Sequence, residues 1–111
     1  MTITTTAVGP RPALVISREV LSERDRQDAR FGEQNHPDGT GSASDGKRAD
    51  AARALCDSST KHGSLTWKEV LDEEVREAFA ESDPPRLREE LIQVAAVAAA
   101  WAEAIDRRAT S

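Results

Sequence analysis

Apolar residues recur every three or four positions through the C-terminal half of the chain, a spacing typical of amphipathic α-helices. Thr66 and Glu69 form a capping-box pattern, which predicts a helix that starts there and ends near Ser82. Asp83 and Pro84 suit the cap and the first residue of a further helix. Because the link between these two helices is so short, they are expected to pack against each other as antiparallel neighbours.

Two more helices are predicted in the N-terminal half. One begins near Ser17 or Ser22 and ends by Phe31, and the other runs from about Lys47 to His62 with Asp45 as its cap. Composition agrees, because Ala supplies much of the apolar content and the chain has only two Trp, two Phe and no Tyr. The sequence therefore predicts an all-α four-helix bundle.

The 111 residues support a single domain. We expect a flexible arm over residues 1–16, one domain over residues 17–108 and a short tail over residues 109–111. Residues 32–46 are rich in Gly, Pro, Asn, Asp and Ser, which predicts a long loop between the first two helices. A loop of this length is either functional or mobile.

Charge and composition argue against several classes of protein. The net charge is −5 and no basic cluster is visible, which argues against a nucleic-acid-binding protein such as a helix-turn-helix regulator. Cys56 is the only cysteine, so no disulfide framework is possible, and we expect it to be a small buried residue. No signal peptide is evident, and the apolar stretch from Val94 to Ala102 is too short to span a membrane. A cytoplasmic protein without a membrane partner is expected.

Several carboxylates fall on or beside the apolar faces of the last two helices. At about 100° per residue, Glu74 lies roughly 50° from the centre of its apolar face, with Glu77 at the edge and Glu73 further round. Glu90 lies roughly 60° from the centre of the next helix's face, with Gln93 beside it. Each carboxylate can reach water by extending its stem. If they converge instead, a shared proton, an Arg or a hard cation must neutralise them.

These residues resemble the MazG-like nucleoside triphosphate pyrophosphohydrolases, which belong to the all-α nucleotide pyrophosphohydrolases. LDEEVREAFAESD carries an EExxE motif, and LREELIQV resembles the second acidic motif, ExxD. ERDRQDARFGEQNHPDG and AAVAAAWAEAIDRR resemble short MazG-like proteins of actinobacteria and their phages. The resemblance spans roughly residues 17–108. It implies a helical bundle completed by oligomerisation, as a homodimer or a homotetramer.

The resemblance also implies hydrolysis of a (d)NTP to a (d)NMP and pyrophosphate with Mg²⁺ or Mn²⁺ as cofactor. By position, Glu74, Glu77 and Glu90 are the implied metal ligands, and Glu73 is the implied catalytic residue, holding a second metal or accepting a proton from the attacking water. Gln93 stands where the ExxD motif has Asp. Its carbonyl can coordinate Mg²⁺ without adding charge.

The substrate side of the prediction is less specific. Gln34, Asn35 and His36 lie in the predicted loop and are expected to border the nucleotide, although a solvated surface loop has the same composition. Trp67 can stack on a base or serve as a core anchor. The alternative to an enzyme is a weak or inactive helical module that acts in oligomerisation or nucleotide binding, which the Gln93 departure favours.

Overall fold

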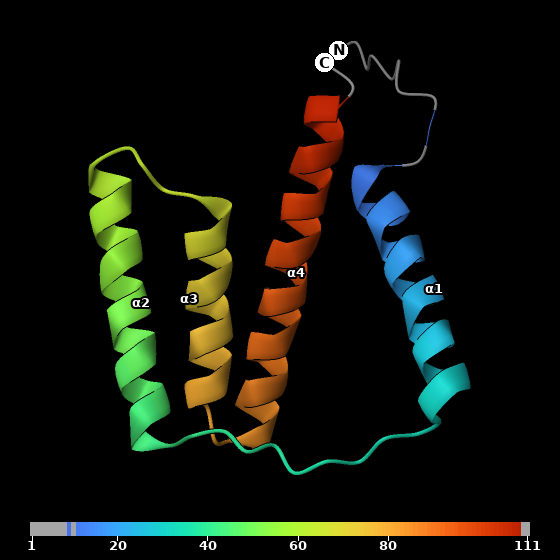
Figure 1. Cartoon of the computed structure of the whole chain (residues 1–111), viewed down its shortest axis with the longest axis horizontal. Helices are drawn as coiled ribbons and strands as arrows, with labels where there is room; N and C mark the ends of the chain where they lie inside the picture. The colour runs from blue at the N-terminus through green and yellow to red at the C-terminus, as the bar shows by residue number, and fades with distance from the viewer. Residues whose placement is uncertain (1–8, 10, 110–111) are drawn as a thin grey trace, which may run out of the picture. The chain divides into compact units, whose positions relative to one another are not determined.

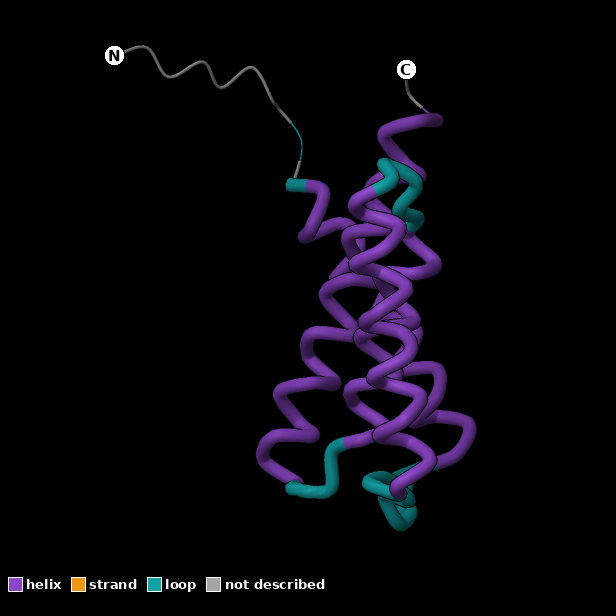
Figure 2. The backbone as a smooth tube through the Cα atoms, turned by 90° about the vertical axis from the view of Figure 1, so that its left-hand side faces the viewer, coloured by secondary structure: helices purple, strands orange, loops and turns teal. Residues whose placement is uncertain are grey.

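The computed structural model describes Gly9 and residues 11–109, and this part of the chain forms four α-helices (Figure 1). They are α1 (Pro12–Phe31), α2 (Ala43–Lys61), α3 (Trp67–Ala80) and α4 (Pro84–Ala109). No strand occurs among the described residues, and loops join the helix ends (Figure 2). The all-α prediction with four helices is therefore confirmed. Within the same residues, no helix has the length and apolar character that crossing a membrane requires.

The chain divides into two compact units, and each is described by itself. One unit holds the described residues up to Asn35 together with residues 102–109, and the other holds residues 36–101. The second unit thus contains α2, α3 and most of α4. The single domain over residues 17–108 stays a prediction. Most of the predicted arm and all but Ala109 of the predicted tail lie outside the described residues.

Helix α1 begins earlier than the sequence suggested. Pro12, whose fixed φ suits a first helical residue, starts the helix, so residues 12–16 are helical and not part of an arm. The predicted start near Ser17 or Ser22 is wrong, because both residues lie inside the helix, where the Ser17 hydroxyl donates a hydrogen bond to the Ala13 carbonyl (2.7 Å). The end at Phe31 is confirmed. Gly32 follows at φ 68°, a left-handed conformation that favours glycine.

Helix α2 also begins before its predicted start at Lys47. Its cap is Ser42, whose hydroxyl accepts a hydrogen bond from the Asp45 N–H (3.0 Å). The Asp45 carboxylate accepts one from the Ser42 N–H in return (3.2 Å), which completes a capping box. Asp45 is therefore the third helical residue and not the cap. This start was not predicted, because the Gly and Ser residues that surround it are typical of loops.

The start signals of α3 and α4 are confirmed. The Thr66 hydroxyl accepts a hydrogen bond from the Glu69 N–H (3.2 Å), and the Glu69 carboxylate accepts one from the Thr66 N–H (2.9 Å). Asp83 caps α4 by accepting a hydrogen bond from the Arg86 N–H (3.3 Å). Helix α3 ends at Ala80, two residues before the predicted Ser82.

Helices α2 and α3 lie side by side and run in opposite directions (Figure 1). Polar contacts fix their register along the seam. Near one end, the Ser59 hydroxyl donates to the Glu69 carboxylate and the Cys56 thiol donates to the Glu69 carbonyl (3.1 Å). Further along, the Arg53 guanidinium reaches the Glu77 carboxylate (3.4 Å). Residue numbers fall along α2 as they rise along α3, so the register brings Arg53 to the C-terminal half of α3.

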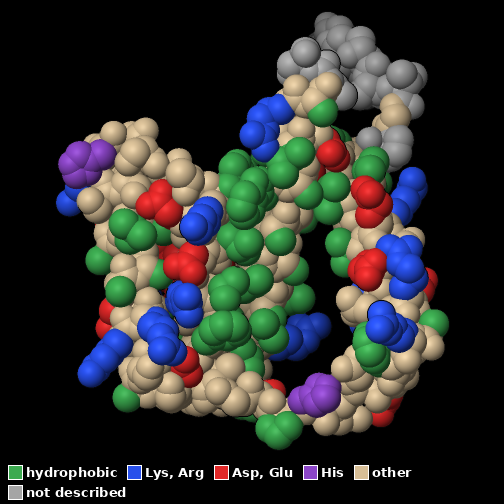
Figure 3. Space-filling view, in the orientation of Figure 1, with side chains coloured by type: hydrophobic (Ala, Val, Ile, Leu, Met, Phe, Trp, Pro, Cys, Tyr) green, Lys and Arg blue, Asp and Glu red, His purple; other side chains and the backbone are tan. Residues whose placement is uncertain are grey.

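Small side chains allow this close approach. The buried residues of the second unit are Ala49, Ala52, Cys56, Ser59, Ala78 and Leu87. Cys56 is buried as expected. Larger apolar side chains gather over α4, as the space-filling view shows (Figure 3), and Leu91 and Ile92 on that helix are about half exposed.

The loop before α2 is attached to the C-terminal end of α3. The Gly41 N–H donates a hydrogen bond to the Phe79 carbonyl (2.8 Å), and the Thr40 hydroxyl donates to the Glu81 carbonyl (2.6 Å). These bonds satisfy acceptors that the helix end leaves free. Gly41 has φ 90°, and a Cβ there would lie 2.6 Å from the Ser82 Cβ. Only glycine therefore fits this contact.

We predict that Gly41→Ala lowers the free energy of unfolding by about 2 kcal/mol or more, through left-handed backbone strain and the clash with Ser82. Gly46→Ala is the matched control. It lies inside α2 with open space around it, so the same change should stabilise the protein by about 0.5–1 kcal/mol. Urea unfolding monitored by circular dichroism measures both. Equal effects would contradict the role of Gly41.

Candidate metal centre

The two acidic segments converge in the structure. One carboxylate oxygen each from Glu74, Glu77 and Glu90 lies within 4.8 Å of the other two. Glu74 and Glu77 are three residues apart on α3 and so share a face, and Glu90 comes from the first turns of α4. The short link between Ala80 and Pro84 folds α4 back along α3 and brings the second segment to the first. The sequence left open whether these carboxylates converge or reach water separately, and in the structure Glu74, Glu77 and Glu90 converge.

Two oxygens of the cluster are buried without a partner. Glu74 Oε2 and Glu90 Oε2 have almost no exposed surface and accept no hydrogen bond. A buried carboxylate oxygen without a donor costs free energy, and native proteins rarely leave one so. These two atoms therefore indicate that a proton or a cation completes the cluster.

Electrostatics lead to the same conclusion. Burial raises the pKa of Glu74, and the neighbouring carboxylates of Glu77, Glu90 and Glu73 raise it further. Burial likewise raises the pKa of Glu90, and the carboxylate of Glu77 is the next largest cause. Two unit charges at this separation repel by roughly 1 kcal/mol in water and by about 3 kcal/mol in a partly buried site. A bound divalent cation would reverse the sign of this interaction.

Arg53 is the functional candidate that the sequence analysis missed. Its guanidinium lies 3.4 Å from Glu77 and 3.1 Å from Asp50, and Glu77 raises its pKa. The signal was present, because Arg53 follows Ala49 by four positions and precedes Cys56 by three. That spacing places it on the same face of α2 as buried residues.

A pocket of about 280 Å³ lies beside the cluster. Helix α2 contributes Ala49 and Arg53 to its wall, α3 contributes Glu77 and Ala80, and the remaining lining residues are Glu81 and Glu90. The two alanines leave space, while the charged side chains give the pocket its polarity. A small polyanion that shares a cation with the carboxylates would fit a pocket of this size and composition.

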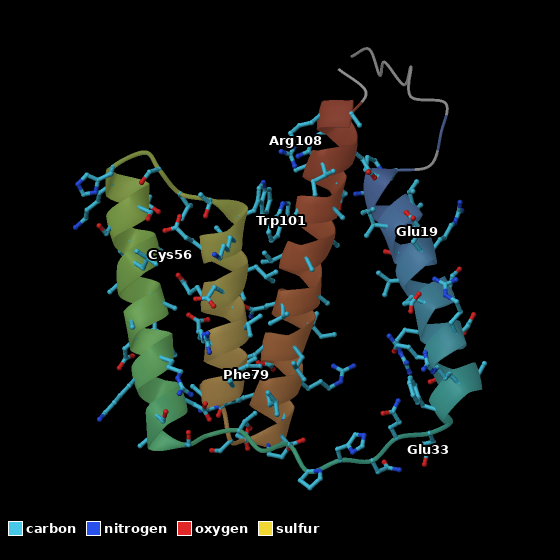
Figure 4. The ribbon with its side chains drawn as sticks, in the orientation of Figure 1. Glu19, Glu33, Cys56, Phe79, Trp101 and Arg108 are labelled. Carbon is cyan, nitrogen blue, oxygen red and sulfur yellow. The ribbon has the colours of Figure 1, made fainter. Side chains whose placement is uncertain are left out.

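Glu73 lies apart from the three clustered groups. It faces the α2 side of α3, where its carboxylate adjoins the Cys56 thiol. Burial, followed by this contact, raises the pKa of Cys56 to about 12, so the thiol stays protonated at neutral pH. Figure 4 labels Cys56 on α2. A catalytic role for Glu73 would require its carboxylate to turn away from Cys56.

The predicted ligand Gln93 is exposed on α4, three residues after Glu90. Trp67 is the first residue of α3, at the helix end opposite the pocket. Ten residues separate it from Glu77, or about 15 Å along the helix axis. Its side chain is 37% exposed beside Leu65 and Val70. Trp67 is therefore neither a buried core anchor nor a neighbour of the carboxylates.

The predicted substrate loop is exposed. Gln34 and Asn35 belong to the first unit, and Asn35 donates a hydrogen bond to the Glu33 carboxylate (3.2 Å). His36 begins the second unit and is also exposed. A contact between these three residues and a nucleotide stays a prediction.

We predict that the metal-free protein loses stability as pH rises above about 4.5. The pKa values of Glu74 and Glu90 are higher in the folded than in the unfolded chain, so folding favours their protonated forms. Stability is then lost as pH rises through the raised values. Asp45 and Glu69 have lowered pKa values, so the stability that they contribute is lost as pH falls through those values. This loss occurs at more acidic pH than the loss due to Glu74 and Glu90.

Thermal unfolding between pH 5 and pH 8 in EDTA measures this dependence. Glu74→Gln should flatten it, and Glu89→Gln, on the exposed face of α4, should leave most of it in place. Identical pH profiles for the wild type and Glu74→Gln would argue against mutual repulsion within the cluster.

Comparison with protein-family models, with curated proteins and with solved structures finds no match for this chain. The resemblance to MazG-like enzymes therefore remains a prediction. The site consists of three carboxylates from two helices, two of which have a buried oxygen without a partner, and one arginine at the neighbouring pocket.

Proposed function

We propose that this chain is a Mg²⁺-dependent nucleoside triphosphate pyrophosphohydrolase, which cleaves a (d)NTP to a (d)NMP and pyrophosphate. The observation that carries the proposal is the convergence of Glu74, Glu77 and Glu90, two of which have buried oxygens without partners. The resemblance of the two acidic segments to MazG-like enzymes supplies the reaction. Geometry and resemblance select the same three residues.

The donor set fits a hard divalent cation. Carboxylate oxygens are the ligands that Mg²⁺ and Mn²⁺ prefer. Opposite ligands of Mg²⁺ lie about 4.2 Å apart, so oxygens within 4.8 Å of one another need only a small side-chain movement. Bound Mg²⁺ would supply charge neutralisation at the phosphates and lower the pKa of a water molecule.

The protein's own residues would position the reactants. Glu74, Glu77 and Glu90 would hold the cation, and the adjacent pocket would receive the phosphates. Glu73 remains the proposed acceptor of the water proton, with its carboxylate turned away from Cys56. Gln93, three residues after Glu90 on α4, remains a proposed ligand through its carbonyl oxygen. Gln34, Asn35, His36 and Trp67 remain proposed substrate contacts.

Incubation of the pure protein with each NTP and dNTP tests the proposal. We expect pyrophosphate release that requires Mg²⁺ or Mn²⁺ and is abolished by EDTA. Glu74→Gln and Glu90→Gln should each lower the rate by roughly 100-fold or more, since each removes a charged ligand from the transition-state cluster.

Glu89→Gln is the matched control for this experiment. It removes the same charge from the residue next to Glu90 but on the exposed side of α4, and it should retain most of the activity. No pyrophosphate from any nucleotide with either metal would refute the enzyme.

One alternative is favoured by specific observations. Among the described residues only Glu74, Glu77 and Glu90 form the carboxylate cluster, since Glu73 adjoins Cys56 and Gln93 brings no charge. These three carboxylates would be enough for a catalytically weak or inactive helical module that binds a metal–nucleotide complex. Nucleotide-dependent thermal stabilisation without pyrophosphate release would identify this alternative.

We further propose that the chain forms a homodimer or homotetramer. Leu91 and Ile92 on α4 and Phe79 near the end of α3 are about half exposed (Figure 4 labels Phe79). A small helical core gains stability when a second copy covers such side chains. Size-exclusion chromatography with light scattering should give at least twice the mass of one chain, and Ile92→Glu should lower that mass. A monomer at micromolar concentration would refute the oligomer.

A further inference from the structure

Arg53 occupies a position that the carboxylate cluster alone does not explain. Among the described residues that line the pocket beside the cluster, it is the only basic one. It comes from α2, whereas the carboxylates come from α3 and α4. The α2–α3 register holds it there, through the Cys56 and Ser59 contacts to Glu69 one to two turns away.

The contacts of Arg53 are weak enough to exchange. Its guanidinium lies 3.4 Å from Glu77, which is long for a hydrogen bond, and 3.1 Å from Asp50, which is 79% exposed. The Arg53 side chain is itself 50% exposed. The pair with Asp50 is exposed on both sides and contributes little to stability, while Glu77, whose side chain is 23% exposed, is reached only over the longer distance. The guanidinium can therefore leave both partners at small cost.

The excess negative charge of the occupied pocket would require a further positive group such as Arg53. Three ionised carboxylates around one divalent cation leave one negative charge in excess. A di- or triphosphate chain adds more, so its outer phosphate would be repelled without a further cation. A guanidinium is suited to this task, because its planar fork of donors matches two phosphate oxygens.

We propose that Arg53 is a substrate-positioning residue that releases Glu77 and binds the phosphate chain of a metal–phosphate complex. In the free protein, Arg53 covers Glu77. When the complex binds, Glu77 turns to the cation and Arg53 to the phosphate oxygens. This inference rests on the proposed function, and it names Arg53 as the determinant that selects a polyphosphate over a bare cation.

Titration calorimetry of the full chain tests the proposal with two probes. The first probe is Mg²⁺ or Mn²⁺ alone, and the second is methylenediphosphonate, a diphosphate analogue without a hydrolysable bridge, at saturating metal. Arg53→Gln should weaken methylenediphosphonate binding by about 10- to 100-fold, the loss typical of a charged hydrogen-bond pair. Binding of the metal alone should stay equal or tighten by up to about 5-fold, because Glu77 is freed.

Two further variants complete the design. Arg53→Lys should lose less affinity than Arg53→Gln, since it keeps the charge but not the fork. Arg48→Gln removes the same charge from the same helix, outside the pocket, and should bind methylenediphosphonate like the wild type. Far-ultraviolet circular dichroism confirms that each variant is folded.

The outcomes separate this inference from the proposed function. If the wild type binds metal and hydrolyses a nucleotide while Arg53→Gln binds methylenediphosphonate equally well, the role of Arg53 is refuted and the enzyme stands. Equal losses in Arg48→Gln and Arg53→Gln would also refute it, because general surface charge would then explain the effect. If the wild type binds neither metal nor the diphosphonate, both proposals fail.

Discussion

The proposed metal site depends on the mutual repulsion among carboxylates that are partly removed from water. The cluster on α3 and α4 places three carboxylate oxygens within 4.8 Å of one another, and two of its oxygens have no donor. A fold gains nothing from such an arrangement by itself, since apolar or paired residues would be more stable there. A bound proton or cation would relieve this repulsion, so the proposed ligand would also stabilise the fold.

The scaffold that holds the cluster is the antiparallel pair of α2 and α3. Small buried residues such as Ala52 and Ala78 let the helices approach, and polar contacts set their register. Helix formation alone would not prevent α2 and α3 from sliding past each other. The capping box at Thr66 and Glu69 contributes twice, because Glu69 also accepts the Ser59 hydrogen bond across the seam. Local and tertiary signals thus favour one register.

Much of this architecture was predictable from the sequence, for identifiable reasons. Caps and periodicity gave the starts of α3 and α4, and helical angles singled out Glu74 and Glu90 as carboxylates on apolar faces. The start of α2 was missed because a capping box embedded among glycines resembles a loop. Arg53 was missed because its importance comes from a neighbouring helix. The position of Glu73 against Cys56 likewise depends on tertiary packing, which single-helix geometry does not contain.

The attachment of the loop to the end of α3 has a mechanical consequence. Thr40 and Gly41 bind the carbonyls of Glu81 and Phe79, so the entry to α2 and the exit from α3 move as one body. The two bonds thereby tie together the helix ends that carry Ala49 and Ala80 of the pocket wall. A displacement of the last turn of α3 would therefore carry the start of α2 with it, so a change at either helix end would reach both walls of the pocket.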